Sequence, residues 1–546
     1  RSERRGGPRA IVARHETGAA FMAEGYAIKT GKLGVCCATT GPGATNMITG
    51  VASAYENNVP LLVITAQTAL ANFGRGAIQD SSCNGIDTVG LFEYCTRYNT
   101  LVSHPNQLEY KLSSAIMAAM HSPAGPVHLS IPMDVMRGQA LSSSPSFDLC
   151  SLLEKPSLLD GTAVNQFYDE LVNANNPVFV IGDEAGEAIG SILSVVVKRQ
   201  AKILVTPHGK GLVSPYHPLF RGVIGFAGHE SADELLAGSD VDLVVAVGTN
   251  LGEFASGISD VWLKKKIIHV EATEEHLLRT PMAKLHVRGR LSTIFDQLNG
   301  RMKESERTSV KTNKVTEIPM SASGQKPQLR QYFRLEDPEG YSTDATPIKP
   351  QRLMCLLPEI FPPNTRYLAD SGASLTWAAH YLHPYDRRME GKRNACGGLY
   401  RSALEFGSMG WAIGSAIGAA LADQSGPVVC ITGDGSMLMN GQEITVAIQE
   451  KLPVVFVVLN DSCYGMVHHG QSLTGAEPVG CELPKVDFSA FAKSMGADSY
   501  IINSPEDLRA LNIPNICKQG GPTLLDVRID RNEVPPMGAR IKSLTQ

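Results

Sequence analysis

The chain has 546 residues, which is too long for a single hydrophobic core and predicts about three domains. Hydrophobic residues make up 43% and charged residues 19%, a composition typical of soluble globular proteins. The formal net charge is -5, and no basic stretch is concentrated enough to indicate a nucleic acid partner. The sequence also contains no run of 18 apolar residues that could span a membrane.

The cysteines and the N-terminal residues indicate a cellular compartment. The 11 cysteines are scattered without the paired spacings of a zinc site or a disulfide framework, which favours a reducing compartment. The basic start, RSERRGGPR, has no apolar stretch behind it and so does not resemble a signal peptide. We therefore expect a cytoplasmic protein, and this expectation leaves open a targeting signal upstream of Arg1.

Residues 1–150 alternate strand and helix patterns and predict a doubly wound α/β domain. A strand is expected over 10–16, ending at Glu16, followed by a helix over 17–31 that Gly31 closes. Further strands are expected over 33–40, 59–67 and 126–134. The glycine turn at 40–46 opens another helix, whose free N–H groups could bind an anion or could simply make a tight connection.

Two further segments repeat this alternation, so the whole chain is predicted to be α/β with three parallel-sheet domains. Residues 158–302 contain four strand-plus-turn units and predict a central Rossmann-like domain, although without a GxGxxG turn. Residues 303–345 are polar and indicate a linker. The third domain is expected over 346–535, with a tail over 536–546.

The third domain contains the most informative stretch of the sequence. We expect a buried strand over 428–431, a tight turn over 433–436, a helix over 442–450 and a second buried strand over 454–459. Asp434 follows the first strand and Asn460-Asp461 end the second. The carboxyl ends of parallel strands share one edge, so these oxygen-bearing side chains could hold a small hard cation.

The GDG turn at 433–435, separated by residues 436–459 from Asn460-Asp461, resembles the signature of enzymes dependent on thiamine diphosphate. That resemblance implies Mg2+ bound by Asp434, by Asp461 and by the backbone carbonyl of Cys463. Asp461 stands where the family more often has Asn, and an Asp can also bind Mg2+ through oxygen. The resemblance further places the cofactor diphosphate on Gly435 and Ser436.

Within that family, three segments in the same order resemble acetolactate (acetohydroxyacid) synthases: RHETGAAFMAEGYA, TTGPGATN and VPLLVITAQ. The resemblance makes Glu16 the catalytic glutamate that exchanges a proton with the cofactor's aminopyrimidine. It also assigns Pro42 and Asn46 to cofactor binding. Gln79, in GRGAIQD, matches a glutamine near the reacting carbonyls, and an alternative register would put Asn84 there instead.

Further positions are carried over from the same resemblance. In DSGAS, Ser374 falls where the family contacts the diphosphate. A small-residue helix is expected over 407–422, and its start, GSMG, matches a family motif. On that match Gly407 offers a backbone carbonyl to the aminopyrimidine and Met409 is the apolar wedge that bends the cofactor. A plain core methionine is the alternative for Met409.

Three departures from the synthases affect substrate and cofactor predictions. Ile78 replaces a family Phe, and Gly470 replaces a Trp that shapes the pocket for the second 2-oxoacid. GTNLGEF (248–254) lacks the arginine that the resemblance leads us to expect near a flavin. In the synthases FAD has a structural role. Here the central domain could bind FAD or could be empty. The preferred acceptor and a biosynthetic or specialised role stay open.

The resemblance implies an acetolactate synthase-like carboligase that decarboxylates pyruvate and joins the remaining two-carbon unit to a second 2-oxoacid. The alternatives are another thiamine diphosphate enzyme, such as a lyase, decarboxylase or pyruvate oxidase, and a non-catalytic nucleotide-binding protein. Active sites of the family lie between subunits, so we expect a homodimer or homotetramer. Relatives carry further residues before the segment that starts at Ala10, so the start of this domain is expected to be missing.

Overall fold

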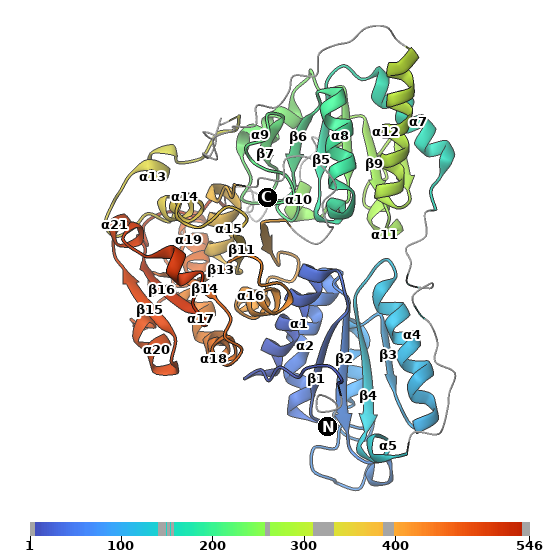
Figure 1. The fold of residues 1–546 in the computed structure, drawn as a ribbon, viewed down its shortest axis with the longest axis vertical. Coiled ribbons are helices and arrows are strands. Elements are labelled where there is room, and N and C mark those ends of the chain that lie inside the picture. The colour runs from blue at the N-terminus through green and yellow to red at the C-terminus, as the bar shows by residue number, and fades with distance from the viewer. Residues whose placement is uncertain are drawn as a thin grey trace.

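The computed structural model describes residues 6–139, 149, 153, 158–256, 262–308, 332–385 and 398–537. The described residues form three parallel sheets, each covered by helices, which confirms the predicted α/β class (Figure 1). The third domain packs against both others: α1 of the first domain lies on α16 of the third, and Lys210 of the second donates to the Ala378 carbonyl at 2.6 Å. In the described ranges, no helix has both the length and the apolar character needed to cross a bilayer.

The first sheet has four parallel strands in the order β1-β2-β4-β3. β4 is buried along its whole length, and parallel strands with both faces covered are apolar throughout, as this one is apart from His128 and Ser130. The strands are β1 Gly34–Ala38, β2 Leu61–Gln67, β3 Tyr98–Leu101 and β4 Pro126–Pro132, and the helices are α1 Glu16–Thr30, α2 Pro42–Glu56, α3 Thr88–Phe92, α4 Leu108–Met120 and α5 Met133–Arg137.

The predicted strand over 10–16 is wrong. Residues 7–13 have no regular structure, and Glu16 is the first residue of α1. The backbone N–H groups of Arg14 and His15 donate to the carboxylate of Glu443 in the third domain, at 3.1 and 2.8 Å, so a side chain takes the place of a neighbouring strand. The predicted end of the helix is confirmed, since Gly31 adopts the left-handed conformation (φ 67°) that closes it.

The second sheet has six parallel strands in the order β10-β9-β8-β5-β6-β7. The four predicted strand units are confirmed as β5, β6, β8 and β9, and the order is that of a dinucleotide-binding fold. The strands are β5 Pro177–Ile181, β6 Lys202–Val205, β7 Phe220–Val223, β8 Leu243–Val247, β9 Ile267–Glu271 and β10 Leu285–Arg288, and the helices are α7 Gly161–Asn173, α8 Ile189–Arg199, α9 Glu230–Ala237, α10 Glu253–Ser256, α11 Glu274–Leu277 and α12 Leu291–Thr308.

The predicted linker over 303–345 is partly helical. α12 continues to Thr308, and a short helix, α13 (Pro338–Ser342), begins at a proline after the Asp337 cap. Asp337 accepts a hydrogen bond from the Gly340 N–H at 2.8 Å, which satisfies one of the free N–H groups at the helix start. Residues 309–331 lie outside the described residues, as do residues 538–546 of the predicted tail.

The third sheet has six parallel strands in the order β12-β11-β13-β14-β16-β15. The strands predicted over 428–431 and 454–459 are confirmed as β13 and β14. The strands are β11 Arg366–Ala369, β12 Tyr400–Ser402, β13 Val428–Gly433, β14 Val454–Asn460, β15 Asp498–Ile502 and β16 Thr523–Arg528, and the helices are α14 Pro350–Ile360, α15 Ala373–Tyr381, α16 Trp411–Ala422, α17 Asp434–Asn440, α18 Ile444–Gln449, α19 Gly465–Leu473, α20 Phe488–Met495, α21 Pro505–Arg509 and α22 Ile513–Ile516.

Two local predictions in the third domain are wrong. The predicted turn over 433–436 is the start of α17, because Asp434 already has helical backbone. The predicted helix over 407–422 begins only at Trp411, because Gly407 and Gly410 have positive φ angles of 66° and 86° and cannot lie in a right-handed helix.

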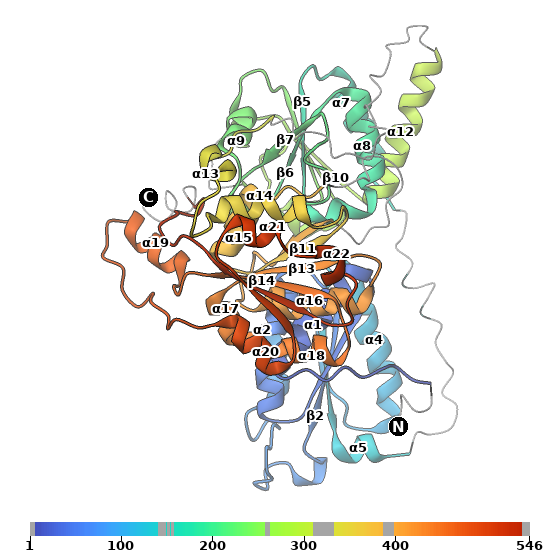
Figure 2. The same ribbon diagram turned by 60° about the vertical axis from the view of Figure 1, so that its left-hand side comes forward.

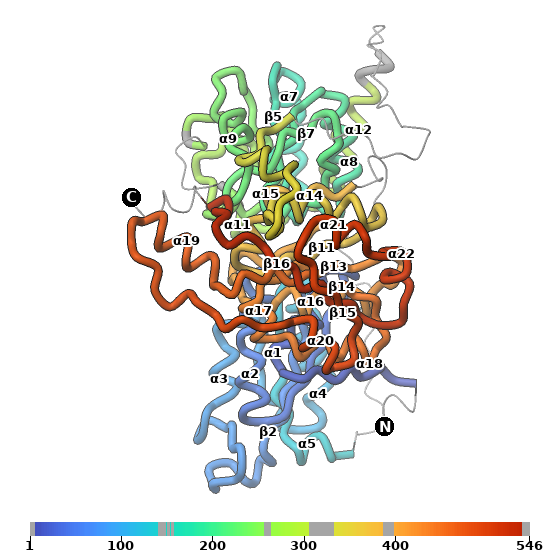
Figure 3. Tube along the Cα trace, turned by 90° about the vertical axis from the view of Figure 1, so that its left-hand side faces the viewer, coloured from blue at the N-terminus to red at the C-terminus, as the bar shows by residue number. Residues whose placement is uncertain are grey.

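Small residues bring the first and third domains close together. A Cβ atom on Gly25 of α1 would lie 2.2 Å from the Ser415 carbonyl, and one on Gly418 of α16 would lie 2.0 Å from the Met22 carbonyl. The two helices therefore touch through their backbones, which no larger side chain would permit. Figures 2 and 3 show α1 and α16 side by side in the middle of the molecule, with the third domain between the other two.

Candidate active site

A cavity opens at the carboxyl edge of the third sheet, where the loops after β11, β13 and β14 meet the first turn of α19. In open α/β sheets this edge is where ligands bind. Every residue that lines the cavity lies between 350 and 535, so it belongs to the third domain alone. Seven of the predicted site residues are among them: Ser374, Met409, Asp434, Gly435, Ser436, Asp461 and Cys463.

Two carboxyl groups face this cavity from neighbouring strand ends. The Cys463 N–H donates to Asp434 Oδ2 at 3.3 Å and to Asp461 Oδ1 at 3.2 Å, so one backbone group bridges both acids. Burial and the charge of Asp434 raise the pKa of Asp461 to about 7. Two carboxylates held this close repel each other unless a cation lies between them, which fits a site for a divalent metal ion.

The turn after β13 has the features of a phosphate-binding site. Ser436 is buried and lines the cavity, and its hydroxyl has no hydrogen-bond partner among the described residues. Such a buried hydroxyl is costly unless a ligand satisfies it. A Cβ atom on Gly435 would lie 2.5 Å from the Tyr464 ring, so only glycine fits there. The residues present therefore fit a diphosphate bound through Mg2+.

Asp370, at the end of β11, is a positioning residue that sequence reasoning did not single out. Its buried carboxylate accepts hydrogen bonds from the Gly410 N–H at 3.0 Å and from the Thr432 hydroxyl at 2.9 Å. Burial raises its pKa to about 6. These contacts tie the loop that carries Met409 to β13. An acid directly after a buried strand was the available signal, and the pattern could not show that it points inward.

The predicted residues Met409, Gly407 and Ser374 differ in how they lie relative to the cavity. Met409 lines the cavity, and its methyl carbon would lie 3.1 Å from a Cβ atom on Gly435, so the side chain stands beside the phosphate-binding turn. Gly407 does not line the cavity. Ser374 does, but its hydroxyl already donates to the Asp370 carbonyl at 2.9 Å, so it has no proton left to offer a ligand in this orientation.

The predicted residues of the first domain gather around the turn that precedes α2. The amide of Asn46 donates to Glu16 Oε2 at 3.1 Å, and the Thr40 hydroxyl donates to the Gln79 carbonyl at 3.0 Å. Glu16 is half-buried, whereas Pro42, Asn46 and Gln79 are exposed. None of these residues lines the cavity of the third domain. One chain therefore holds two separate groups of predicted site residues.

One side of the cavity includes α19. His469 lines the cavity, while Gly470 does not, and a Cβ atom on Gly470 would meet only the Met537 methyl carbon, at 3.8 Å. The space beside Gly470 is therefore open.

Comparisons with known proteins agree with this geometry. Residues 2–88 match the family model "Thiamine pyrophosphate enzyme, N-terminal TPP binding domain", residues 164–298 match its central domain, and residues 370–527 match its C-terminal TPP binding domain. The chain belongs to the thiamine pyrophosphate enzymes.

The most informative relatives within this family are acetolactate synthases. The chain is 28% identical to the acetolactate synthase isozyme 1 large subunit of Escherichia coli, over 97% of this chain and 90% of that protein. It is 29% identical to a probable acetolactate synthase large subunit of Methanocaldococcus jannaschii, over 98% and 88%. The acetolactate synthase of Arthrospira platensis is also 29% identical, over 98% and 89%. The predicted family resemblance is thereby confirmed along nearly the whole chain.

Proposed function

We propose that this protein is a thiamine diphosphate-dependent enzyme of the acetolactate synthase type. It removes CO2 from pyruvate and transfers the remaining two-carbon unit to a second 2-oxoacid, which gives 2-acetolactate when the acceptor is pyruvate. The observation that carries this proposal is the cavity of the third domain, where Asp434, Asp461 and the unsatisfied Ser436 hydroxyl converge. The match to acetolactate synthases along the chain supports the choice of reaction.

The residues of the third domain would hold the cofactor. Asp434, Asp461 and the backbone carbonyl of Cys463 are the proposed Mg2+ ligands, and Gly435 and Ser436 face the diphosphate. Met409 would be the apolar wedge that bends the cofactor. Gly407 would offer its backbone carbonyl to the aminopyrimidine. When bound, thiamine diphosphate supplies the reactive carbon and the electron sink that decarboxylation needs. The protein supplies orientation and keeps water from the reacting groups.

Glu16 is the proposed proton-transfer group. The Glu16 carboxyl group could exchange a proton with a nitrogen of the cofactor's aminopyrimidine. The hydrogen bond that Asn46 donates to Glu16 fixes the orientation of this carboxyl group. Because Glu16 does not line the cavity of its own chain, we propose that it reaches the cavity of a partner subunit. Gln79, on the same exposed face, would contact the reacting carbonyls.

Exposed apolar side chains support an interface on the first domain. Ile78 is 89% exposed and Ile86 is 57% exposed, and both belong to the loop that carries Gln79. Large apolar side chains gathered on one loop mark a contact surface. A homodimer is therefore the proposed minimum unit, and a homotetramer and a cytoplasmic location stay predictions.

Whether the central domain binds FAD stays a prediction. Glu271 is buried at the carboxyl end of β9, and Glu184 follows β5 at the same edge. Burial and then the charge of Glu271 raise the pKa of Glu184 well above its usual value, and His276 Nδ1 lies 3.5 Å from a carboxylate oxygen of each acid. No step of the proposed reaction uses a flavin. The visible absorption spectrum of the purified protein tests this, since a bound flavin would give its characteristic bands.

A different carboligase, lyase, decarboxylase or pyruvate oxidase on the same scaffold is the second candidate. The observation in its favour is Gly470, which stands where synthases have a Trp and has open space beside it. Incubation with pyruvate, thiamine diphosphate and Mg2+ decides between the candidates. We expect acetolactate. Acetaldehyde or acetyl phosphate would support the second candidate, and no product with any 2-oxoacid would indicate a non-catalytic protein.

A further inference from the structure

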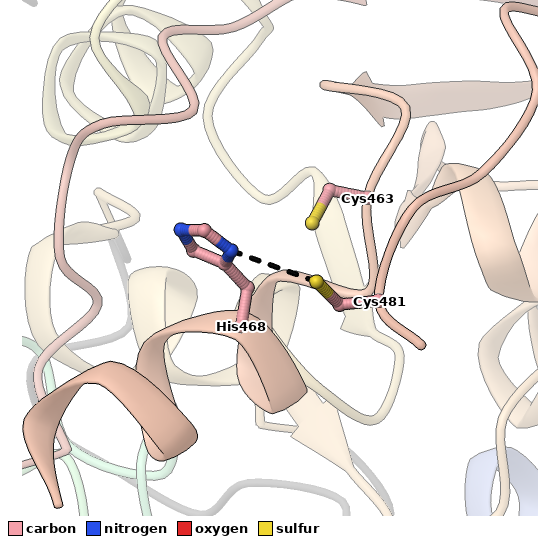
Figure 4. A group of neighbouring side chains, drawn as sticks. All are labelled: Cys463, His468 and Cys481. Atoms are coloured by element: carbon pink, nitrogen blue, oxygen red, sulfur yellow. Dashed lines mark hydrogen bonds between the residues drawn. The ribbon is translucent and has the colours of Figure 1, made fainter. Parts of the chain in front are cut away.

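Three side chains suited to a soft metal ion meet beside the candidate active site. Cys463 lies just after β14, His468 on α19, and Cys481 on the chain that returns after α19. Figure 4 shows their sulfur atoms and imidazole ring pointing toward one another. The two Sγ atoms and one ring nitrogen all lie within 4.8 Å of each other. The proposed Mg2+ ligands are two carboxylates and the backbone carbonyl of Cys463, so they use none of these three side-chain atoms.

The distance between two of these atoms matches a tetrahedral zinc site. Bonds of about 2.3 Å from Zn2+ to sulfur and about 2.0–2.1 Å to nitrogen place the two ligand atoms about 3.6 Å apart at a tetrahedral angle. Cys481 Sγ and His468 Nδ1 are 3.6 Å apart. Both cysteines are buried, with 5% and 2% of their surface exposed, whereas His468 is half-buried and leaves one side of the cluster open to solvent.

The backbone fixes the two cysteines relative to each other. The Tyr464 N–H donates to the Cys481 carbonyl at 2.7 Å, and the Leu483 N–H donates to the Ser462 carbonyl at 2.8 Å. These hydrogen bonds hold the segments antiparallel, with Cys463 opposite Glu482. The cysteine thiols are therefore brought together before any metal arrives, which removes part of the ordering cost of binding.

We propose that Cys463, His468 and Cys481 form a binding site for Zn2+, with two sulfur ligands, one nitrogen ligand and the fourth position open to water or a small ligand. Thiolate and imidazole ligands select such a metal over Mg2+, which prefers oxygen. Binding releases the thiol protons and forms no covalent bond between the cysteines. Because the Cys463 N–H also bridges Asp434 and Asp461, the zinc site and the proposed Mg2+ site share one turn of the chain.

The test uses the full-length protein stripped of metals and kept reduced. Titration with Zn2+ against a chromophoric competitor is expected to give one site per chain, with an excess of Mg2+ present throughout. Titration with Co2+ is expected to give a thiolate-to-cobalt charge-transfer band, which oxygen ligands do not produce. Zn2+ is also expected to raise the unfolding temperature of the protein, because it binds the folded chain more tightly than the unfolded chain.

Substitutions at the ligands provide the controls. Cys481→Ser and His468→Asn are expected to weaken Zn2+ binding by more than the roughly 10–100-fold that outer-shell changes cost, and Cys481→Ser is expected to abolish the Co2+ band. Cys37→Ser changes an exposed thiol elsewhere and His469→Asn changes the neighbouring histidine, so both are expected to bind Zn2+ as the parent does. Circular dichroism confirms that each variant is folded.

Three results would overturn the proposal. The first is the absence of stoichiometric Zn2+ binding by the reduced parent protein. The second is a Co2+ spectrum with oxygen and nitrogen ligands only, which would place the metal at the carboxylates. The third is unchanged affinity in folded His468→Asn and Cys481→Ser. Each result concerns metal binding alone, so it is independent of whether the protein makes acetolactate.

Discussion

The carboxyl edges of the first and third sheets differ in how they present their predicted site residues. In the third domain, the loops after three strands converge on one cavity that buries Asp434 and Ser436. In the first domain, Glu16 is half-buried, and Gln79 is exposed on a loop beside 89% exposed Ile78. The third domain contains the proposed cofactor site, whereas the first domain exposes its predicted residues on a surface. This difference supports the proposal that a second chain completes the site.

The largest effect is expected from removing Asp434, a proposed Mg2+ ligand of the third domain. Asp434→Ala leaves the diphosphate charge without the cation that neutralises it, so Mg2+ and thiamine diphosphate binding should be lost together. We expect activity to fall by roughly a thousandfold or more, which corresponds to about 4 kcal/mol of lost stabilisation. Calorimetry measures the cofactor affinity directly, and an unchanged affinity would contradict the proposed role of Asp434.

A change on the first domain should separate chemistry from binding. Glu16→Gln keeps the size of the side chain and its contact with Asn46, but an amide cannot exchange the proton. Activity should fall by about 100- to 10,000-fold while cofactor affinity stays nearly constant. Steady-state kinetics and calorimetry on the same preparation measure both quantities. Normal turnover in this variant would remove Glu16 from the mechanism.

The acidic pair of the third domain predicts a pH dependence of stability. Asp461 has a pKa of about 7 in the folded protein, above the value of about 3.9 of an exposed aspartate. Between these values the folded state binds more protons than the unfolded state, so the stability of the metal-free protein falls as pH rises from about 4 to 7. Mg2+ should restore stability at high pH, because its positive charge offsets the repulsion between the Asp434 and Asp461 carboxylates.

The control for this effect is Asp461→Asn, which introduces the residue that the family more often has. The variant cannot ionise at this position, so its metal-free unfolding temperature should fall less between pH 5 and pH 8 than that of the parent. Thermal unfolding at several pH values with and without Mg2+ measures this. If the unfolding temperature of the parent and of Asp461→Asn fell equally with pH, Asp434 and Asp461 would not be the cause of the pH dependence of stability.

The smallest effect is expected at the acceptor side. Gly470 has open space beside it, and apolar contacts that distinguish one methylene are worth about 1–3 kcal/mol. Gly470→Trp should therefore shift the ratio of products toward the larger acceptor, 2-oxobutanoate, by roughly 10- to 200-fold. Competition between pyruvate and 2-oxobutanoate measures this ratio. A strong preference for 2-oxobutanoate in the parent would show that another residue already fills the space that the Trp occupies in the synthases.

Most of the fold could be predicted because buried parallel strands are almost wholly apolar. The strands around 428–431 and 454–459 follow from this pattern alone, and so does the shared edge of Asp434 and Asp461. The helix over 407–422 was placed too early, since positive φ angles at Gly407 and Gly410 are a property of the folded loop. The strand expected before Glu16 failed because its N–H groups bond a side chain distant in sequence.

The site was less accessible to sequence reasoning wherever distant segments meet. Asp370 joins two loops through buried hydrogen bonds, and no spacing in the sequence reveals this role. The cluster of Cys463, His468 and Cys481 has none of the short spacings typical of zinc sites, because an antiparallel pairing brings its members together. Both features depend on contacts that only the tertiary fold creates.

Subunit complementation tests most directly whether the first domain of one chain and the third domain of another form one active site together. Glu16→Gln and Asp434→Ala are combined by co-expressing the two variants, each nearly inactive alone, and purifying the mixture. If each site takes Glu16 from one chain and Asp434 from the other, half of the dimers are mixed and each has one intact site. We predict that activity returns to about a quarter of the parent value. Activity no higher than that of the separate variants would show that each chain forms its site alone, and would contradict the account.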